Sequence, residues 1–372
     1  MKNPASDLEQ GEPASLPLTF PCGLVMKNRF MLAPMTNSQS HEDGSLSDDE
    51  FNWLSLRAKG GFGLTMTCAS HVQKVGQGFV GQLGIFSDDH IEGHSRLATA
   101  IKSEGSLAVI QLHHAGTRSP EGLIGQQAVC PSSDEETGAR ALRLEEVHEL
   151  RDDFIRAAVR AKTAGYDGVE IHGAHGYILT QFISQQYNHR DDEYGGSLAN
   201  RAKLVFEIAQ GIRQECGGRF LLGVRLSPER YGLKLLETLQ LAQQLIDSEL
   251  FDFLDVSLWD CFKPPEEEDH KEQSLLEHVM SLDKKNVKLT VAGKIGRGKQ
   301  VQEVLDAGAD FVTIGRAAIL HYDYPRRVIE DSDFEPITTP VSAAYLKEQG
   351  LGPAFVAYMR RWKNFVTEDP KE

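Results

Sequence analysis

The sequence has no closely spaced cysteines. Its five cysteines are scattered along 372 residues, with no C-x-x-C pair and an odd total. An iron–sulfur cluster of the usual kind needs closely spaced cysteines, so none is expected here. Scattered, odd-numbered cysteines are typical of a reducing compartment, and we expect a cytoplasmic protein.

Basic residues are also in short supply. Lysine and arginine total 39 against 54 aspartate and glutamate, a formal charge of -15, and no local basic patch interrupts the excess. Such a charge repels nucleic acid and anionic membranes. The sequence opens with no signal-type leader and holds no apolar run long enough to span a bilayer. We therefore expect no nucleic-acid or membrane partner, and a bound phosphate would need backbone N–H groups and one or two cations.

A G-x-G-x-x-G turn is missing after the first predicted strand, which disfavours an open dinucleotide-binding sheet. Short apolar runs instead alternate with longer helical stretches, a pattern typical of parallel α/β folds. Eight strands in one chain suit a closed (β/α)₈ TIM barrel better than an open sheet, which has about five or six. The expected strands are Phe30–Ala33, Leu64–Thr67, Leu107–Leu112, Gly168–Ile171, Leu221–Val224, Phe253–Val256, Lys288–Val291 and Phe311–Ile314.

Helical stretches lie between these strands, and most of them end at a glycine. The first follows a capping box that starts at Ser47. The expected helices are Phe51–Ala58, Ile91–Ser103, Leu144–Thr163, Leu198–Glu215 and Lys299–Asp306.

These elements predict a single barrel with two flanking segments. Residues 1–17 are expected to be a flexible N-terminal arm, residues 18–340 the barrel, and residues 341–372 a tail helix. One connection, about 117–143, is too rich in proline and glycine for a standard helix. It is expected either as a lid insertion after the third strand, over the catalytic mouth, or as a plain surface loop.

Two histidines stand out just after the fourth strand. His172 and His175 are three residues apart, bounded by glycines, and Tyr177 follows. The pair could bind a metal, act as acid and base, donate hydrogen bonds to one substrate oxygen, or be structural. Tyr177 adds a group suited to delivering a proton.

The ends of the last two strands have the composition of a phosphate site. Gly293 and Gly315 let backbone N–H groups approach an anion, and Lys294 and Arg316 supply positive charge. Many barrels hold phosphate at this position. Ordinary tight turns with solvated basic residues are the alternative.

Several motifs, in order, resemble the old yellow enzyme family, whose members are flavin mononucleotide (FMN) dependent. They are Asn28 to Thr36, Gln111 to Gly116, His172 to Tyr177, Asn188 to Ser197, Val312 to Arg316 and Leu351-Gly352-Pro353. The likeness runs from about Leu16 to Phe365. It implies tightly bound FMN, with NADH or NADPH as reductant. It also implies cofactor contacts from Ala33, Pro34, Met35, Thr36, Ala69, Gln111, Arg225, Gly293, Lys294, Gly315 and Arg316.

The resemblance also implies a reaction. His172 and His175 would hold the carbonyl oxygen of an electron-poor alkene, a hydride from flavin N5 would add to the β-carbon, and Tyr177 would protonate the α-carbon. Arg225 would face flavin N1 and O2, where negative charge gathers on reduction. Ser38 occupies a substrate-facing position. A homodimer is typical of such proteins.

Two features depart from the family pattern. Thr117 precedes Arg118, where the family usually has arginine directly after Ala-Gly, so the role of Arg118 stays open. Cys68 stands where an acidic residue is common, and its role stays open too.

Other functions remain as alternatives. The flavin barrel could instead act as an oxidative demethylase or a nitro reductase. A metal-dependent hydrolase would use His113, His114, His172 and His175, but the first strand ends in Ala33-Pro34-Met35-Thr36, which offers no metal ligand. A flavin-binding protein without turnover would not need the histidine pair. We expect no metal.

Overall fold

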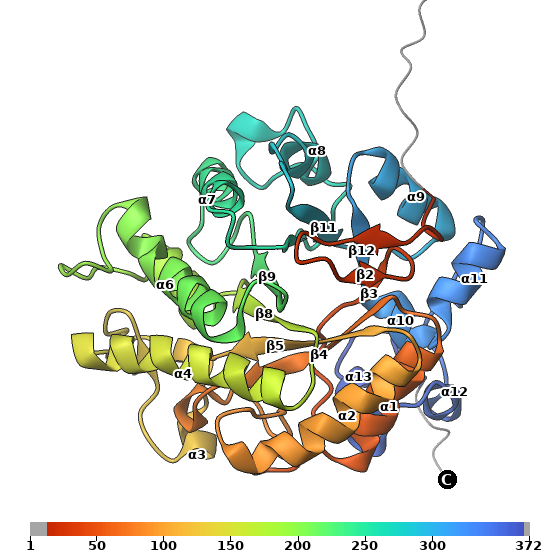
Figure 1. Ribbon diagram of the computed structural model, residues 1–372, viewed down its shortest axis with the longest axis horizontal. Coiled ribbons are helices and arrows are strands. Elements are labelled where there is room, and N and C mark those ends of the chain that lie inside the picture. The colour runs from red at the N-terminus through yellow and green to blue at the C-terminus, as the bar shows by residue number, and fades with distance from the viewer. Residues whose placement is uncertain (1–12, 368–372) are drawn as a thin grey trace, which may run out of the picture.

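Eight parallel strands close into a barrel at the centre of the molecule (Figure 1). The computed structural model describes residues 13–367. In chain order the barrel strands are β3 (Phe30–Leu32), β4 (Leu64–His71), β5 (Leu107–His113), β8 (Gly168–Gly173), β9 (Leu221–Leu226), β10 (Phe253–Ser257), β11 (Lys288–Ala292) and β12 (Phe311–Ile314). All eight expected strands are confirmed, and the fold is a (β/α)₈ TIM barrel.

The barrel closes where the last strand meets the first. Val312 of β12 is in register with Phe30 of β3, and Ile314 with Leu32. Strands buried on both faces read as continuous apolar runs, which is why the sequence showed them. Several strands extend beyond their apolar runs: β4 reaches His71, β5 reaches His113 and β8 reaches Gly173. These extensions carry polar residues to the carboxyl ends.

The helices surround the barrel, as Figure 1 shows. They are α1 (Asp48–Lys59), α2 (Ile91–Ser103), α3 (Glu121–Ile124), α4 (Leu144–Thr163), α5 (Ile178–Ile183), α6 (Leu198–Cys216), α7 (Leu235–Asp247), α8 (Leu275–Met280), α9 (Gly298–Asp306), α10 (Arg316–Leu320), α11 (Tyr324–Glu330), α12 (Ala343–Glu348) and α13 (Pro353–Met359). The five expected helices correspond to α1, α2, α4, α6 and α9. None of the helices described between residues 13 and 367 is both long and apolar enough to cross a membrane.

The capping box expected at α1 is only half formed. The Ser47 side chain accepts from the Glu50 N–H (3.1 Å), as predicted. The Glu50 carboxylate does not return to the cap. It is fully buried and accepts from Asn37 (3.0 Å) and Ser40. The prediction failed there because a tertiary contact with the loop after β3 replaced the local one.

A short hairpin closes the amino end of the barrel. Its strands are β1 (Leu18–Thr19) and β2 (Val25–Met26), which pair antiparallel. Phe20 lies between them and packs against Phe253 (5.9 Å) and Phe311 (5.7 Å). Gly223 makes room for this cluster, since a Cβ there would lie 2.0 Å from the Phe253 ring. The lower half of the barrel is thus an apolar plug.

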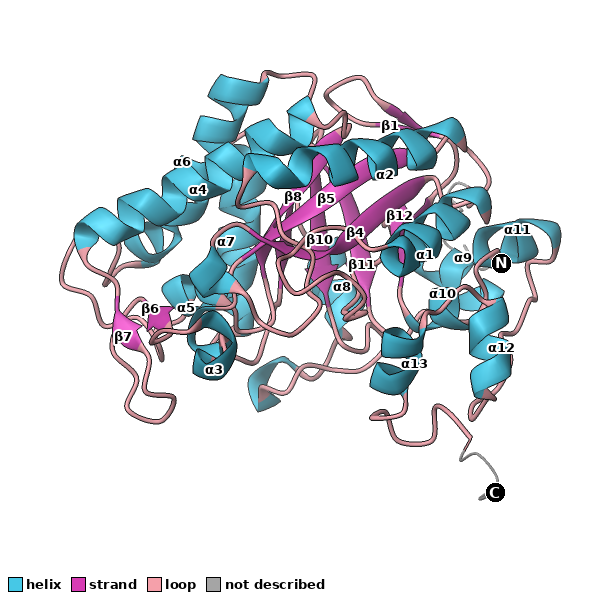
Figure 2. Ribbon diagram, turned by 90° about the horizontal axis from the view of Figure 1, so that it is seen from below, coloured by secondary structure: helices cyan, strands magenta, loops and turns pink. Residues whose placement is uncertain are grey.

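The segment after β5 forms a small excursion with two-residue strands β6 (Val129–Cys130) and β7 (Arg140–Ala141), which pair in parallel. Figure 2 shows α3, β6 and β7 beside α5. Arg190, in the loop after α5, ties the excursion down by donating to the carbonyls of Pro131 (2.8 Å) and Leu142 (2.6 Å). The expected insertion is an ordered structure at this position.

Both ends of the chain differ in detail from expectation. Residues 1–12 of the expected arm lie outside the described residues, and within 13–17 the Ala14 carbonyl accepts from Arg29 N–H (2.8 Å). Where one tail helix was expected in 341–372, the described part holds α12 and α13. Gly350 adopts a left-handed φ of +82° between them, which interrupts a continuous helix.

Candidate functional site

The carboxyl ends of the strands bring the expected site residues to one mouth of the barrel. Pro34, Met35, Thr36 and Ser38 follow β3, and all four are half-buried. The remaining expected residues come from β4, β5, β8, β9, β11 and β12: Ala69, Gln111, His172, His175, Tyr177, Arg225, Gly293, Lys294, Gly315 and Arg316. Half-buried residues such as Pro34, Met35 and Thr36 at the mouth are what a bound ligand would cover.

Backbone strain gathers at the same mouth. Nine non-glycine residues of the described chain have a left-handed φ, and six of these follow barrel strands at their carboxyl ends. These six are Ser38, His175, Arg230, Tyr231, Trp259 and Lys294. Residues other than glycine adopt this conformation at a cost, and such strain clusters at functional sites.

A buried polar layer lies beneath the mouth. Gln111 donates to Glu170 (Nε2 to Oε1, 2.6 Å), and Arg225 forms an ion pair with Asp255 (Nε to Oδ2, 3.1 Å). All four side chains are almost fully buried. Glu170 Oε2, Arg225 Nε and Asp255 Oδ2 have no aligned hydrogen-bond partner in the described residues. Unsatisfied groups at such depth are costly unless a ligand completes them.

One cation serves two carboxyl groups in this layer. Burial, with the nearby Asp255 carboxylate, raises the pKa of Glu170 to about 8. Burial also raises the pKa of Asp255, while Arg225 opposes that rise. Because Arg225 pairs directly with Asp255, we assign the shared proton to Glu170. Arg225, expected as a cation facing the flavin or as a member of a structural ion pair, is therefore partly neutralised by Asp255.

His172 and His175 lie side by side at the end of β8. The Ala174 N–H donates to His172 Nδ1 (3.2 Å), which places the His172 proton on Nε2. That Nε2 lies 3.3 Å from His175 Nδ1, and His175 Nε2 lies 2.8 Å from Ser257 Oγ. Burial lowers the pKa of His172 far below its usual range and that of His175 to about 3. Both imidazoles are thus neutral hydrogen-bonding groups at ordinary pH.

Tyr177 stands next to this pair. Its ring packs edge-to-face with His172 (5.1 Å) and with His113 (4.3 Å). The described residues provide no hydrogen bond to its phenol group, and burial raises the pKa of Tyr177. The phenol is therefore protonated and available to a ligand in the mouth.

The expected phosphate-binding residues are together, but their two cations face protein partners. Lys294 Nζ contacts Asp260 Oδ2 (2.9 Å), and the Arg316 guanidinium lies 5.4 Å from the Trp362 ring. The backbone N–H groups of Lys294 and Arg316 donate to no backbone carbonyl within residues 13–367. Gly293 lets the chain pass close to Cys261, whose N atom would lie 2.9 Å from a Cβ there.

Sequence reasoning missed Glu170, Asp255 and Ser257. A signal was present, because residues two apart in a strand share a face. Glu170 lies two residues before His172, and Asp255 two residues before Ser257. A polar residue inside an apolar strand, two positions before a strand-end candidate, would have identified Glu170 through His172. Asp255 and Ser257 had no such candidate beside them.

The four histidines of the metal-site alternative do not converge. His114 turns away from the mouth, with its ring packed against Gly76 and its Nδ1 accepting from Gly116 N–H (3.1 Å). Across residues 13–367, no group of three or more His, Cys, Asp or Glu side chains is placed to hold one metal ion. These histidines do not form a single ligand set.

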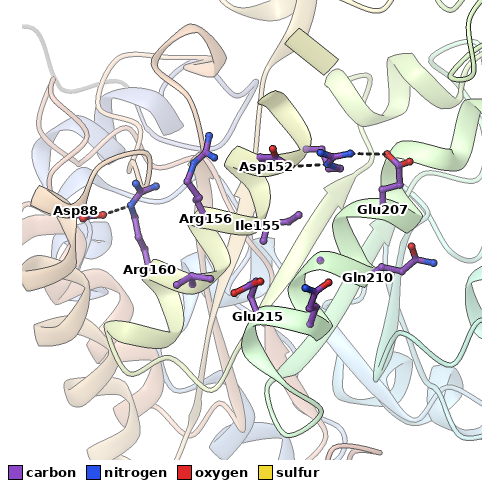
Figure 3. A pocket seen from close by; sticks show the side chains of 12 residues that line it. Asp88, Asp152, Ile155, Arg156, Arg160, Glu207, Gln210 and Glu215 are labelled. Carbon is purple, nitrogen blue, oxygen red and sulfur yellow. Dashed lines mark hydrogen bonds and ion pairs between the residues drawn. The ribbon is translucent and has the colours of Figure 1, made fainter. Parts of the chain in front are cut away.

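A broad hollow also lies on the outer wall of the barrel, between α4 and α6 (Figure 3). Charged pairs line it, including Arg160–Asp88 (2.7 Å) and Arg151–Glu207 (3.9 Å). Gly211 and Ile155, which line the hollow, lie close together: a Cβ at position 211 would lie 2.2 Å from Ile155 Cδ1. No expected site residue lines this hollow. We place the functional site at the mouth.

A parallel barrel with polar residues and strained loops at its mouth, and with backbone N–H groups after its last two strands that donate to no backbone carbonyl in residues 13–367, has the features of a barrel enzyme with a phosphate-binding site. The model of the NADH:flavin oxidoreductase / NADH oxidase family matches residues 16–334. The chain therefore belongs to that family.

Individual proteins agree with the family match. The probable NADH-dependent flavin oxidoreductase YqiG of Bacillus subtilis (strain 168) is 36% identical over 330 residues, covering 86% of this chain and 88% of that protein. The NADPH dehydrogenase of the same organism is 33% identical over 333 residues, covering 86% and 94%.

A solved structure extends the comparison to the fold. The old yellow enzyme homologue from Zymomonas mobilis has a TM-score of 0.78 at 29% identity, covering 93% of this chain and 99% of that one. The protein is thus an NAD(P)H-dependent flavin oxidoreductase of the old yellow enzyme family, and it uses FMN.

Proposed function

We propose that FMN lies across the mouth on the expected residues. The half-buried Pro34, Met35, Thr36 and Ala69 would line the ring, with Ala33 and Gln111 beneath and Arg225 at its polar edge. Two features support this placement: the buried Glu170 Oε2 has no partner among the described residues, and the backbone N–H groups of Lys294 and Arg316 donate to no backbone carbonyl there. FMN held by these residues would supply the hydride chemistry between NAD(P)H and the substrate.

We infer that the substrate of the second half-reaction is an electron-poor alkene conjugated to a carbonyl group. The observation that carries this proposal is the histidine pair, whose facing nitrogens are 3.3 Å apart and neutral. Two neutral N–H donors at one point can hold a carbonyl oxygen and draw electron density from the β-carbon.

Ser257 decides whether both histidines donate. The His172 Nε2–H faces His175 Nδ1 at hydrogen-bond distance (3.3 Å). Arg225 Nη2 donates to Ser257 Oγ (3.5 Å), and we propose that, when a substrate oxygen enters, the Ser257 hydroxyl donates to His175 Nε2, which puts the His175 proton on Nδ1. Both ring N–H groups then donate to the substrate oxygen. The site is thereby prepared for a substrate oxygen.

Tyr177 supplies the proton. Its phenol has no partner among the described residues and is protonated at neutral pH because burial raises its pKa. It lies next to His172, so a substrate oxygen held by the pair places the α-carbon near the phenol. Ser38, half-buried with a φ of 56°, would contact the same substrate.

Single-turnover kinetics test this function. The purified protein should release near-stoichiometric FMN on denaturation. After anaerobic reduction by NADH, 2-cyclohexenone should reoxidise the flavin. His172→Ala and His175→Ala should keep FMN but slow reoxidation by about 10²- to 10³-fold, as expected for loss of an oxygen-holding donor.

His41→Ala is the matched control, because the His41 side chain is exposed and is none of the expected site residues. It should behave as the wild type. Unchanged reoxidation in both site variants would overturn the proposal.

A further inference from the structure

Arg118 lies against the proton-donor residue of the proposed reaction. Its guanidinium carbon is 4.7 Å from the centre of the Tyr177 ring. Its Nη1 donates to the His175 carbonyl (2.8 Å). One exposed side chain from the loop after β5 therefore joins the backbone of one site residue to the ring of another.

The extra residue Thr117 is what places Arg118 there. Thr117 N–H donates to Gln181 Oε1 (3.3 Å), and Gln181 Nε2 donates to Thr117 Oγ1 (3.0 Å) and to the Gly176 carbonyl (2.8 Å). Gln181 is buried on α5 and so clamps the loop after β5 to the loop after β8. The clamp holds Arg118 over Tyr177.

The Tyr177 ring has contacts from several elements. His113 from β5 and His172 from β8 pack edge-to-face with it, and both are neutral because burial lowers their pKa values. Arg118 is the cation that opposes the burial-raised pKa of Tyr177, while Tyr231 and Tyr358 act weakly in the other direction. A negative charge formed on Tyr177 would therefore meet one nearby positive charge, that of Arg118.

We propose that Arg118 is a positioning residue for proton transfer, which holds the Tyr177 ring and stabilises the phenolate left after the phenol protonates the substrate. This rests on the proposed function. In the step, the phenol O–H bond breaks and a C–H bond forms at the α-carbon, using the electron pair left by hydride addition to the β-carbon. Water then returns a proton to the phenolate.

The expected effect is moderate. A guanidinium stacked on an aromatic ring has a modest effect that grows as the pair is desolvated, and Arg118 is exposed. In the FMN-loaded enzyme, Arg118→Gln should slow flavin reoxidation by 2-cyclohexenone about tenfold and leave flavin reduction by NADH within about twofold. Arg118→Lys should recover part of the loss, because the charge is kept while the planar fork is lost.

The pH profile separates this role from a merely structural one. Reoxidation should fall at high pH as Tyr177 ionises, and Arg118→Gln should move that fall to higher pH. An absorbance titration of tyrosine ionisation, taken as the difference from Tyr177→Phe, should show the same shift without turnover. Arg96→Gln is the matched control, because Arg96 lies 4.3 Å over the Phe51 ring on the outer wall. It should change neither readout.

A double-mutant cycle decides the proposal. In a Tyr177→Phe background, Arg118→Gln should have no further effect on reoxidation. Equal slowing in both backgrounds, or a slow Tyr177→Phe beside an unaffected Arg118→Gln, would overturn the role of Arg118 and leave the proposed function standing. A Tyr177→Phe enzyme as fast as the wild type would remove Tyr177 as proton donor, and the role of Arg118 with it.

Discussion

The lower and upper halves of the barrel interior are built on the same strands with opposite chemistry. In the lower half, toward the amino ends of the strands, β5 carries Val109 and β10 carries Phe253. In the upper half, toward the carboxyl ends, β5 carries Gln111 and β10 carries Asp255. The floor is wholly apolar, whereas the layer two residues higher contains two carboxyl groups and a guanidinium. Two residues along each strand separate the apolar floor from the polar layer.

The two halves of the barrel interior serve different purposes, stability and ligand binding. The floor contributes apolar burial and close aromatic packing, the ordinary source of stability. The upper layer contains several buried polar atoms without aligned partners, which costs stability and leaves groups for a ligand. Changes in the floor should therefore affect unfolding, and changes above it should affect chemistry or pH dependence.

The largest expected effect comes from the floor. Phe253→Ala removes a fully buried ring that contacts Phe20 and Phe311, and should lower the free energy of unfolding by about 3 to 5 kcal/mol. Urea denaturation measures this, with the exposed Val80→Ala as control. The folded fraction should still bind FMN with an unchanged spectrum. Loss of FMN at full folding would contradict the separation of the two halves.

A pH-dependent effect should come from the upper layer. Glu170 has a pKa of about 8 in the fold and near 4.5 when unfolded. Between these values the folded state binds more protons than the unfolded state, so wild-type stability falls as pH rises through this window and levels off above about 8.

Glu170→Gln should remove that fall. Its stability relative to the wild type should grow by on the order of 4 kcal/mol between about pH 5 and about pH 9. Urea unfolding of the FMN-free protein at both pH values measures it. A stability difference that does not change with pH would show that Glu170 is ionised throughout.

A smaller effect should follow from Ser257→Ala. Loss of the hydroxyl removes the partner of His175 Nε2 and leaves its tautomer free, which should slow alkene-driven reoxidation about fivefold to tenfold. The floor is untouched, so the free energy of unfolding should change by less than about 1 kcal/mol. Stopped-flow reoxidation and urea unfolding test both statements. Reoxidation at the wild-type rate would remove Ser257 from the site.

The smallest effect is expected in the hollow between α4 and α6. Val159 is partly exposed there, and Val159→Lys should change the free energy of unfolding by less than about 0.5 kcal/mol. FMN content and both half-reactions should match the wild type. A clear loss of turnover would mean that the outer wall, and not the mouth alone, serves the reaction.

The sequence by itself determined the eight strands, five of the helices and which candidate site residues follow the strands. Continuous apolar runs and glycine stops are local signals, so α2 and α4 have the expected bounds. The ends of parallel strands meet at one mouth whatever their order, so listing the residues after each strand was enough to find His172, Tyr177 and Gly293.

Only the tertiary structure decided which of these groups pair. Arg225 with Asp255, Lys294 with Asp260 and Arg118 with Tyr177 are joined across different loops or strands. Likewise, the Glu50 carboxylate accepts from Asn37 in the loop after β3 and not from the cap of its own helix. Such contacts depend on strand order and barrel closure, which bring together residues tens of positions apart, and no local pattern in the sequence records them.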